Sequence, residues 1–303
     1  MTLVIAYFAL IVLLSLLSSA FLSPANFSNI ARTLAVVGIV AIGETMVILI
    51  GGVDISVGSV AALSGVVASL LWTNKLLPIW GCVAVGLLSG ALVGLINGLI
   101  ITRLKINPLI TTLASFSIVR GVAFVLTGGQ SNQLSNAQFQ LLGRGDLGGV
   151  PYSLILMLLL YFIFYFVLRS MPFGRNLYAI GGNVMASRLA GIRVNAYTLT
   201  VYVLCGLFAA LGGIILASQL AAGTPQAATG LEFTVIAAVI LGGTSLSGGK
   251  GSLLGTLLGV LILRTLDNGL ILTGVSSYFQ EVARGVVLLL TVGLDQLRQR
   301  FGR

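Results

Sequence analysis

The stretch IGGVDISVGSVAALSG, residues 50–65, places a carboxylate among glycines and serines between two strongly apolar segments. Glycine permits backbone conformations that interrupt a helix, and serine can cap the start of the next helix. Within a membrane, irregular backbone persists only where protein or a water-filled cavity supplies hydrogen bonds. The stretch therefore predicts a membrane helix that is interrupted at Gly51, Gly52 and Gly58, beside a polar route.

Composition places the rest of the chain in a membrane. Of its 303 residues, 57% are hydrophobic and only 8% are charged, and the mean hydropathy is +1.11. Soluble domains carry about 25% charged residues, so water is not the main solvent for this surface. A crossing helix needs roughly 20 apolar residues, which predicts a single all-α domain over residues 1–303, a polytopic transmembrane bundle with about eight to ten spans.

Ten apolar segments are candidate crossings. Two of them, residues 57–72 and 233–243, are short and lie beside clusters of glycine and serine, as is typical of broken or re-entrant helices. The candidate crossings are residues 3–22, 33–50, 57–72, 79–101, 108–127, 151–168, 197–218, 233–243, 252–266 and 282–294.

The basic residues predict which side of the membrane each loop faces. Residues 169–195 contain four arginines and no acid, Arg103 and Lys105 form a second basic loop, and three arginines lie among residues 298–303. Because cytoplasmic loops carry an excess of Lys and Arg, we expect these segments and both termini in the cytoplasm, and the polar loop 128–149 outside. The formal charge of +9 then reflects topology and contact with membrane lipid rather than nucleic-acid binding, since the cations are scattered.

Several kinds of chemistry are excluded by what the sequence lacks. There is no histidine, and the two cysteines, Cys82 and Cys205, lie inside apolar segments, so the usual metal-ligand sets cannot form. The stretch GGTSLSGGKGS, residues 242–252, resembles a phosphate-binding loop, but Thr244 replaces its first glycine and Gly251 replaces the hydroxyl residue that would hold Mg²⁺. We therefore expect no metal and no cofactor on this chain, and no enzymatic activity.

Residues 242–252 also repeat the opening stretch. When the two stretches are aligned, Gly51-Gly52 matches Gly242-Gly243, and an apolar residue and a serine follow further along in both. Transporters commonly carry internal repeats with broken helices. Six crossings separate the copies, which predicts parallel repeats, or inverted repeats if one short segment re-enters. The alternative is two ordinary loops or glycine-rich packing faces. The predicted breaks in the second copy are Gly242, Gly243, Gly248 and Gly249.

Charged residues inside apolar segments are costly, so they face a cavity or a partner. Arg264 and Asp267, three residues apart, are able to neutralise each other on one helix face. Glu44, Asp54 and Arg120 have no such local partner. The candidate residues of a substrate route are Glu44, Asp54, Ser56, Asn97 and Arg120. The alternative is an interhelical structural role in which Glu44 pairs with Arg120.

Glycines at positions 86, 90 and 94 form a close-packing face at i,i+4 spacing. Packing within the chain is the favoured use of this face, and association with a second copy is the alternative.

Four stretches, in order along the chain, resemble the bacterial ABC sugar permeases of the ribose, xylose, arabinose and galactose group. They are GGVDISVGS (51–59), INGLIITRLKINPLITTLA (96–114), FGRNLYAIGGNVMASRLAGIRV (173–194) and GGTSLSGGKGSLLGTLLG (242–259), and DNGLILTGVSSYFQ (267–280) is most similar to the ribose members. Autoinducer, nucleoside and branched-chain amino acid permeases form related groups. The resemblance implies the permease subunit of an importer that moves a ribose-like pentose or related sugar across the inner membrane by alternating access.

The resemblance also implies partners. A separate ATPase subunit binds ATP and Mg²⁺, a periplasmic binding protein delivers the sugar, and a second permease copy completes the transporter. A short cytoplasmic helix docks on the ATPase in such permeases, and residues 181–194 match that element. The implied docking residues are Asn183, Ala186, Arg188, Ala190 and Gly191.

Two alternatives remain open. The docking-like segment is also compatible with a helix held at the membrane surface by anionic lipid. An ion-coupled secondary transporter, with Glu44 or Asp54 as proton carrier, fits a chain without a nucleotide motif but does not explain the docking-like loop.

Overall fold

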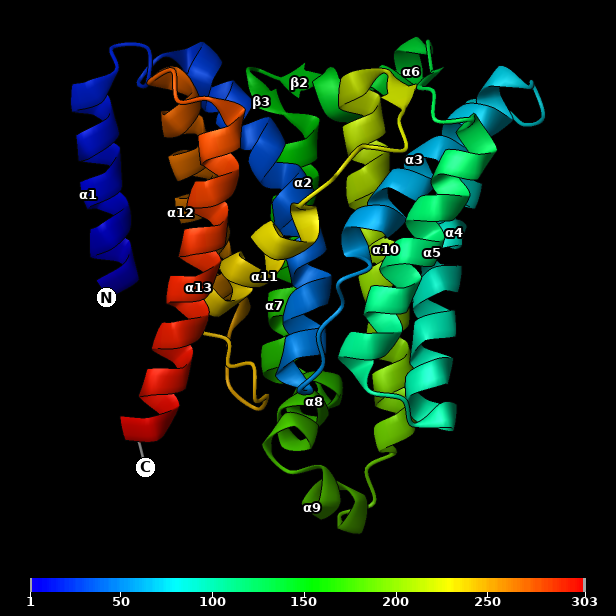
Figure 1. Cartoon of the computed structure of the whole chain (residues 1–303), viewed down its shortest axis with the longest axis vertical. Coiled ribbons are helices and arrows are strands. Elements are labelled where there is room, and N and C mark those ends of the chain that lie inside the picture. The colour runs from blue at the N-terminus through cyan, green and yellow to red at the C-terminus, as the bar shows by residue number, and fades with distance from the viewer. Residues whose placement is uncertain (1, 302–303) are drawn as a thin grey trace.

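A computed structural model describes residues 2–301 and shows a bundle of upright helices (Figure 1). Its helices are α1 (Thr2–Leu17), α2 (Pro24–Leu49), α3 (Val57–Thr73), α4 (Ile79–Leu99), the π-helix η1 (Ile100–Leu104), α5 (Pro108–Thr127), α6 (Ala137–Arg144), α7 (Tyr152–Ser170), α8 (Pro172–Gly182), α9 (Val184–Leu189), α10 (Val194–Leu220), α11 (Leu231–Leu241), α12 (Leu253–Leu272) and α13 (Ser277–Phe301). Two short antiparallel pairs join β1 (Asn132–Gln133) to β4 (Ala222–Gly223) and β2 (Asp146–Leu147) to β3 (Val150–Pro151).

The predicted crossings all coincide with helices, and the all-α polytopic class is confirmed. Among the described residues, six helices are long and apolar enough to span a membrane, namely α2, α4 with η1, α5, α7, α10 and α12, while α1, α3 and α11 are shorter apolar helices. The helices α4, α5 and α7 turn most of their apolar side chains outward, where lipid solvates them. In contrast, α2 is almost entirely buried and forms the centre of the bundle with α10.

The start of α2 differs from the prediction. The apolar pattern placed this crossing at 33–50, but the helix begins at Pro24. Ser23 caps it by accepting a hydrogen bond from the Asn26 backbone N–H at 3.3 Å, and proline is favoured in the first turn. The polar residues of this first part of the helix masked it in the hydropathy pattern.

Two full-length helices are each followed by an extended segment and a shorter helix (Figure 1). The helix α2 runs toward the end that carries α8 and α9, and residues 50–56 then turn back to mid-height, where α3 begins. The helix α10 runs the opposite way, and residues 221–230 turn back to mid-height, where α11 begins. The first turns of α3 and α11 meet there, because a Cβ at Gly58 would overlap the Glu232 carboxylate.

Glycines allow α4 and α10 to cross with their backbones in contact. A Cβ at Gly90 would overlap the Gly206 carbonyl oxygen, and a Cβ at Gly94 would overlap that of Tyr202. Gly86 packs in the same way against Ser64 of α3. These glycines therefore serve packing within the chain, which was the favoured interpretation.

We expect Gly94→Ala to lower the free energy of unfolding by about 1–3 kcal/mol, the usual cost of overpacking. The matched control is Gly121→Ala on α5, where an added Cβ meets no atom within 4 Å and better helix propensity favours the folded state by up to about 1 kcal/mol. Thermal unfolding of the two purified variants measures the difference. Equal midpoints would contradict close backbone packing at Gly94.

Candidate substrate route and coupling surface

Residues 50–56, which we call the first interruption, contain a chain of buried hydrogen bonds that joins α2, α4 and α5. Oδ1 of Asp54 accepts from the Ser56 backbone N–H at 2.9 Å and from its hydroxyl at 2.6 Å. The Asp54 N–H donates to Oε1 of Glu44 on α2 at 3.1 Å. The amide of Asn97 on α4 donates to the Ser56 hydroxyl at 3.1 Å and accepts from Ser115 on α5. Four of the five candidate route residues thus lie in one network.

This network has local causes in the sequence. Gly51 has a φ of 80°, which favours glycine, and it turns the chain after α2. Gly52 leaves room for the hydroxyl of Tyr202 from α10. Asp54 then satisfies two donors of Ser56, which precedes α3. The buried carboxylates therefore hold an otherwise unpaired stretch of backbone inside the bundle.

Arg120 contacts residues 221–230, which we call the second interruption, and it lies away from Glu44. Its Nη1 donates to the carbonyl oxygens of Pro225 at 2.6 Å and Ala227 at 2.8 Å. The alternative that Glu44 pairs with Arg120 is therefore wrong. Two carbonyls of the segment 221–230, which no helix partner satisfies, attract the guanidinium instead.

Glu232 is the main functional candidate that sequence reasoning missed. It is buried in the first turn of α11, with its carboxylate against Gly58 in the first turn of α3, where the positive end of a helix dipole favours an anion. The predicted crossing begins at residue 233, so Glu232 is not among the charged residues that the apolar pattern marks. Cys205, which the sequence places only inside an apolar segment, has its thiol 3.8 Å from the second carboxylate oxygen of Glu44.

The glycines predicted as breaks lie in two places. Gly51 and Gly52 lie between α2 and α3, whereas Gly58 lies inside the first turn of α3. The predicted breaks of the second copy lie in the loop 242–252 between α11 and α12, at the end of the bundle beside α8 rather than at mid-height (Figure 1). The second interruption at mid-height is residues 221–230, which the sequence repeat did not mark.

The two glycine motifs nevertheless meet, and α8 joins them. The Gly249 N–H donates to the Leu49 carbonyl oxygen at 2.9 Å. A Cβ at Gly181 of α8 would overlap both that carbonyl oxygen and the Gly249 N–H, and Gly248 lies against Gly51 and Gly181. We call these five residues the glycine junction. It connects α8 directly to the end of α2, where the first interruption begins.

The predicted docking residues lie on the exposed tip formed by α8 and α9. Asn183 caps α9 by accepting from the Ala186 backbone N–H at 2.9 Å, and Gly191 ends the turn with a φ of 81°. Met185 and Leu189 of the same tip are exposed apolar side chains, of the kind that mark interaction surfaces. All five predicted docking residues are exposed, namely Asn183, Ala186, Arg188, Ala190 and Gly191.

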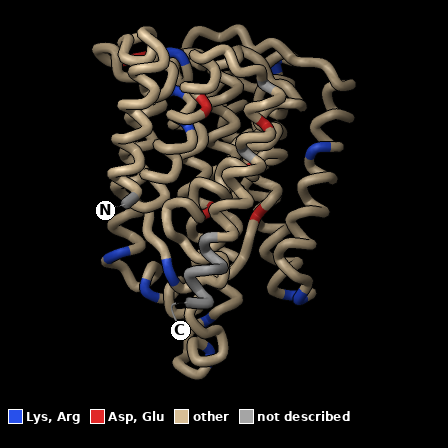
Figure 2. The backbone as a smooth tube through the Cα atoms, turned by 60° about the vertical axis from the view of Figure 1, so that its left-hand side comes forward, with Lys and Arg blue, Asp and Glu red and all other residues tan. Residues whose placement is uncertain are grey.

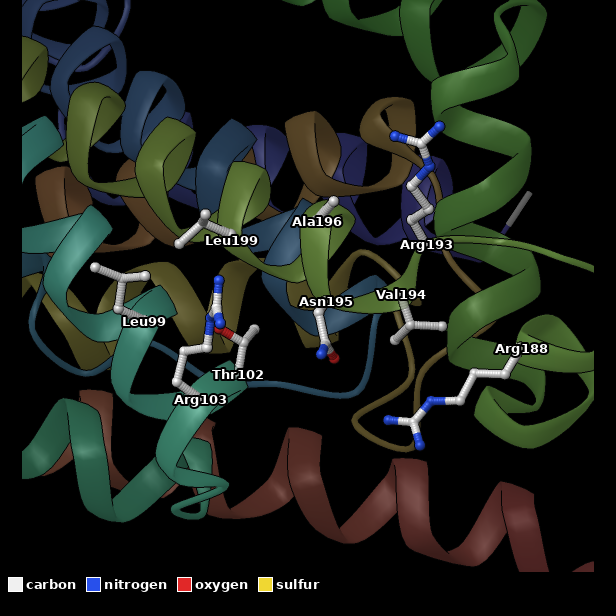
Figure 3. Close-up of a pocket in the computed structure, with 9 residues that line it drawn as sticks. All are labelled: Leu99, Thr102, Arg103, Arg188, Arg193, Val194, Asn195, Ala196 and Leu199. Carbon is white, nitrogen blue, oxygen red and sulfur yellow. The ribbon is translucent and has the colours of Figure 1, made fainter.

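A cleft beside this tip is basic (Figure 3). It has a volume of about 560 Å³ and lies between η1, α9 and the start of α10. Arg103, Arg188 and Arg193 line it with Asn195 and apolar residues. In Figure 2 the coloured residues at this end are basic, whereas basic and acidic residues both occur in the rest of the bundle, which agrees with the positive-inside rule for a cytoplasmic face.

A smaller pocket of about 250 Å³ lies on the side of the second interruption, near the other end of the bundle. Its lining includes hydroxyl, amide and guanidinium groups from α2, α10, α11 and α12. The polar lining residues are Thr33, Gln219, Thr229, Thr234 and Arg264. Arg264 forms the predicted ion pair with Asp267, with the nitrogen and oxygen 2.9 Å apart.

Comparison with known proteins gives consistent relatives. The family described as the permease component of branched-chain amino acid transport systems matches residues 26–292. The chain is 44% identical to the ribose import permease protein of Bacillus subtilis, over 95% of this chain and 90% of that protein. It is 43% identical to the ribose import permease protein of Escherichia coli K12 (97% and 93%) and 40% identical to the L-arabinose ABC transporter permease of Azospirillum brasilense (98% and 87%). No solved structure matches.

Proposed function

Since this chain belongs to the family of transport-system permease components, we propose that it is the transmembrane subunit of an ATP-binding-cassette importer for a ribose-like pentose or related monosaccharide. The observation that carries the proposal is the glycine junction, which joins an exposed docking tip to an interrupted helix at the centre of the bundle. Motion applied to α8 and α9 would reach the route without crossing a flexible linker. The chain itself carries out no covalent chemistry.

In this proposal, α8 and α9 face the cytoplasm of a bacterial cell and bind the separate ATPase, which holds ATP and Mg²⁺. The end that carries α6 faces the periplasmic sugar-binding protein. The positive-inside rule supports this orientation and a cytoplasmic location of both termini. The side chains of Arg298 and Arg300, and the whole of Arg303, which entered that argument, lie outside the described residues.

A second permease copy completes the transporter in this proposal. Ser117, Gln226 and Thr229 are exposed polar residues, on the middle of α5 and on the second interruption. Gln226 donates to the Gly129 carbonyl oxygen at 3.4 Å and Thr229 to the Gln226 carbonyl oxygen at 2.7 Å. Alone in a bilayer, the exposed polar surface of these side chains would still meet hydrocarbon, which is unfavourable. A second copy across a water-filled route would remove that cost.

The test is uptake into proteoliposomes that contain the permease and its ATPase, with ribose-loaded binding protein. We expect uptake to require ATP hydrolysis and to be unchanged by a proton ionophore, because the energy comes from the ATPase. Permease without ATPase is the control. Uptake that persists without ATP and collapses with the ionophore would instead identify an ion-coupled secondary transporter.

A further inference from the structure

We propose that Arg120 and Glu232 form a subsite that binds a hydroxyl group of the sugar at mid-height in the route, an inference that rests on the proposed function. Nη2 of Arg120 and Oε2 of Glu232 are both buried without a hydrogen-bond partner. The two charges interact electrostatically, but they are not among the salt bridges of the described residues. A buried donor and a buried acceptor of the same region are thus both left unsatisfied.

The rest of each side chain is fixed by its surroundings. Nη1 of Arg120 is held by the carbonyls of Pro225 and Ala227. Oε1 of Glu232 accepts from the Gly230 backbone N–H at 3.3 Å. Each group therefore uses one atom to hold the backbone of the second interruption and leaves the other atom for a further partner. A buried charged group without its full set of hydrogen bonds is expensive, so such an arrangement points to function.

Other buried carboxylates in the described part of the bundle are used differently. Glu44 accepts from the Asp54 N–H, and Asp54 accepts twice from Ser56. Both belong to a chain of hydrogen bonds that continues through Ser56 and Asn97. The pair at the second interruption is open by comparison, and it lies where the first turns of α3 and α11 meet.

The chemistry of the pair selects a neutral hydroxyl compound. An anion would be attracted by Arg120 and repelled by Glu232, and a cation would meet the opposite combination. A hydroxyl group accepts from Nη2 and donates to Oε2 at the same time, so it satisfies both atoms without adding charge. A monosaccharide carries several such groups.

The two unsatisfied atoms are enclosed in this conformation, but they lie beside exposed parts of the second interruption. Arg120 is only partly buried, and Gln226 and Thr229 of the same interruption are exposed. The pocket of about 250 Å³ is lined by the end of this segment, from Ala228 to Leu231, immediately before Glu232. A sugar that enters from the α6 end would reach the second interruption before it reaches the glycine junction.

The experiment combines a substitution of the Glu232 side chain with removal of one hydroxyl group from the sugar, as in a double-mutant cycle. Initial uptake rates of ribose and of its monodeoxy analogues are compared for the wild type, Glu232→Ala and Glu232→Gln, with binding protein saturated by each sugar and membrane levels matched. We expect one analogue to be transported about tenfold more slowly than ribose by the wild type, the effect of losing one charge-assisted hydrogen bond. In Glu232→Ala the two sugars should be transported equally slowly, because the same interaction is already absent.

The controls separate this subsite from a structural role and from failure of the proposed function. Asp146→Asn removes the charge that faces Arg32 at 3.9 Å, outside the lining of the pocket, and should leave the ratio of the two sugars at its wild-type value. Glu232→Gln keeps an acceptor oxygen and should show an intermediate ratio. Equal slowing of all sugars by Glu232→Ala, with each analogue penalty retained, would overturn the subsite while leaving sugar transport intact. Absence of any ATP-driven ribose uptake by the wild type would instead refute the proposed function.

Discussion

Gly181→Ala is expected to reduce ATP-driven uptake by about ten- to a hundredfold, the range that corresponds to losing a typical coupling free energy between two sites. The added Cβ would overlap the Leu49 carbonyl oxygen and the Gly249 N–H, so α8 must move away from the end of α2. The hydrogen bond between Leu49 and Gly249 would then be lost or lengthened. The measurement is sugar uptake and ATP hydrolysis on the same proteoliposomes. We expect hydrolysis to continue while uptake falls.

The neighbouring Gly182 provides a matched control. A Cβ there meets no atom within 4 Å, and the residue lies in the same helix, so Gly182→Ala should transport at the wild-type rate. Both variants should insert equally, because the change is at the end of the bundle. Normal coupling in Gly181→Ala would show that the glycine junction does not transmit the motion of the ATPase.

Asp54→Leu is expected to abolish transport, and Asp54→Asn to preserve much of it. Leucine cannot accept the hydrogen bonds from the Ser56 N–H and hydroxyl, so two buried donors lose their acceptor at a cost of about 1–3 kcal/mol each. Asparagine keeps an oxygen in the position of Oδ1.

Uptake and thermal unfolding of the two Asp54 variants, at matched membrane levels, decide what the carboxylate contributes. A stable but inactive Asp54→Asn would show that transport needs the charge itself. Wild-type transport by Asp54→Leu would reduce the first interruption to an ordinary loop. A large fall in the unfolding midpoint of Asp54→Leu alone is the expected result.

Hydropathy and local motifs were enough to predict the membrane location, the helices and the first interruption. These features depend on properties that act over about 20 residues, namely apolar length and the backbone freedom of glycine. Glu44, Asp54, Ser56 and Asn97 were found in the same way, since polar residues in apolar segments need partners. The resemblance to related permeases also predicts the docking segment, which the structure places on an exposed tip.

Partners across the bundle were decided only by the tertiary structure. Arg120 contacts carbonyls more than a hundred residues away, Glu232 lies against Gly58, and Gly181 meets both glycine motifs. Residues 221–230 are polar enough to read as an outer loop, and packing alone brings them back to mid-height. A lone buried charge shows in the sequence that a partner is required, but which group satisfies it depends on the helices that pack beside it.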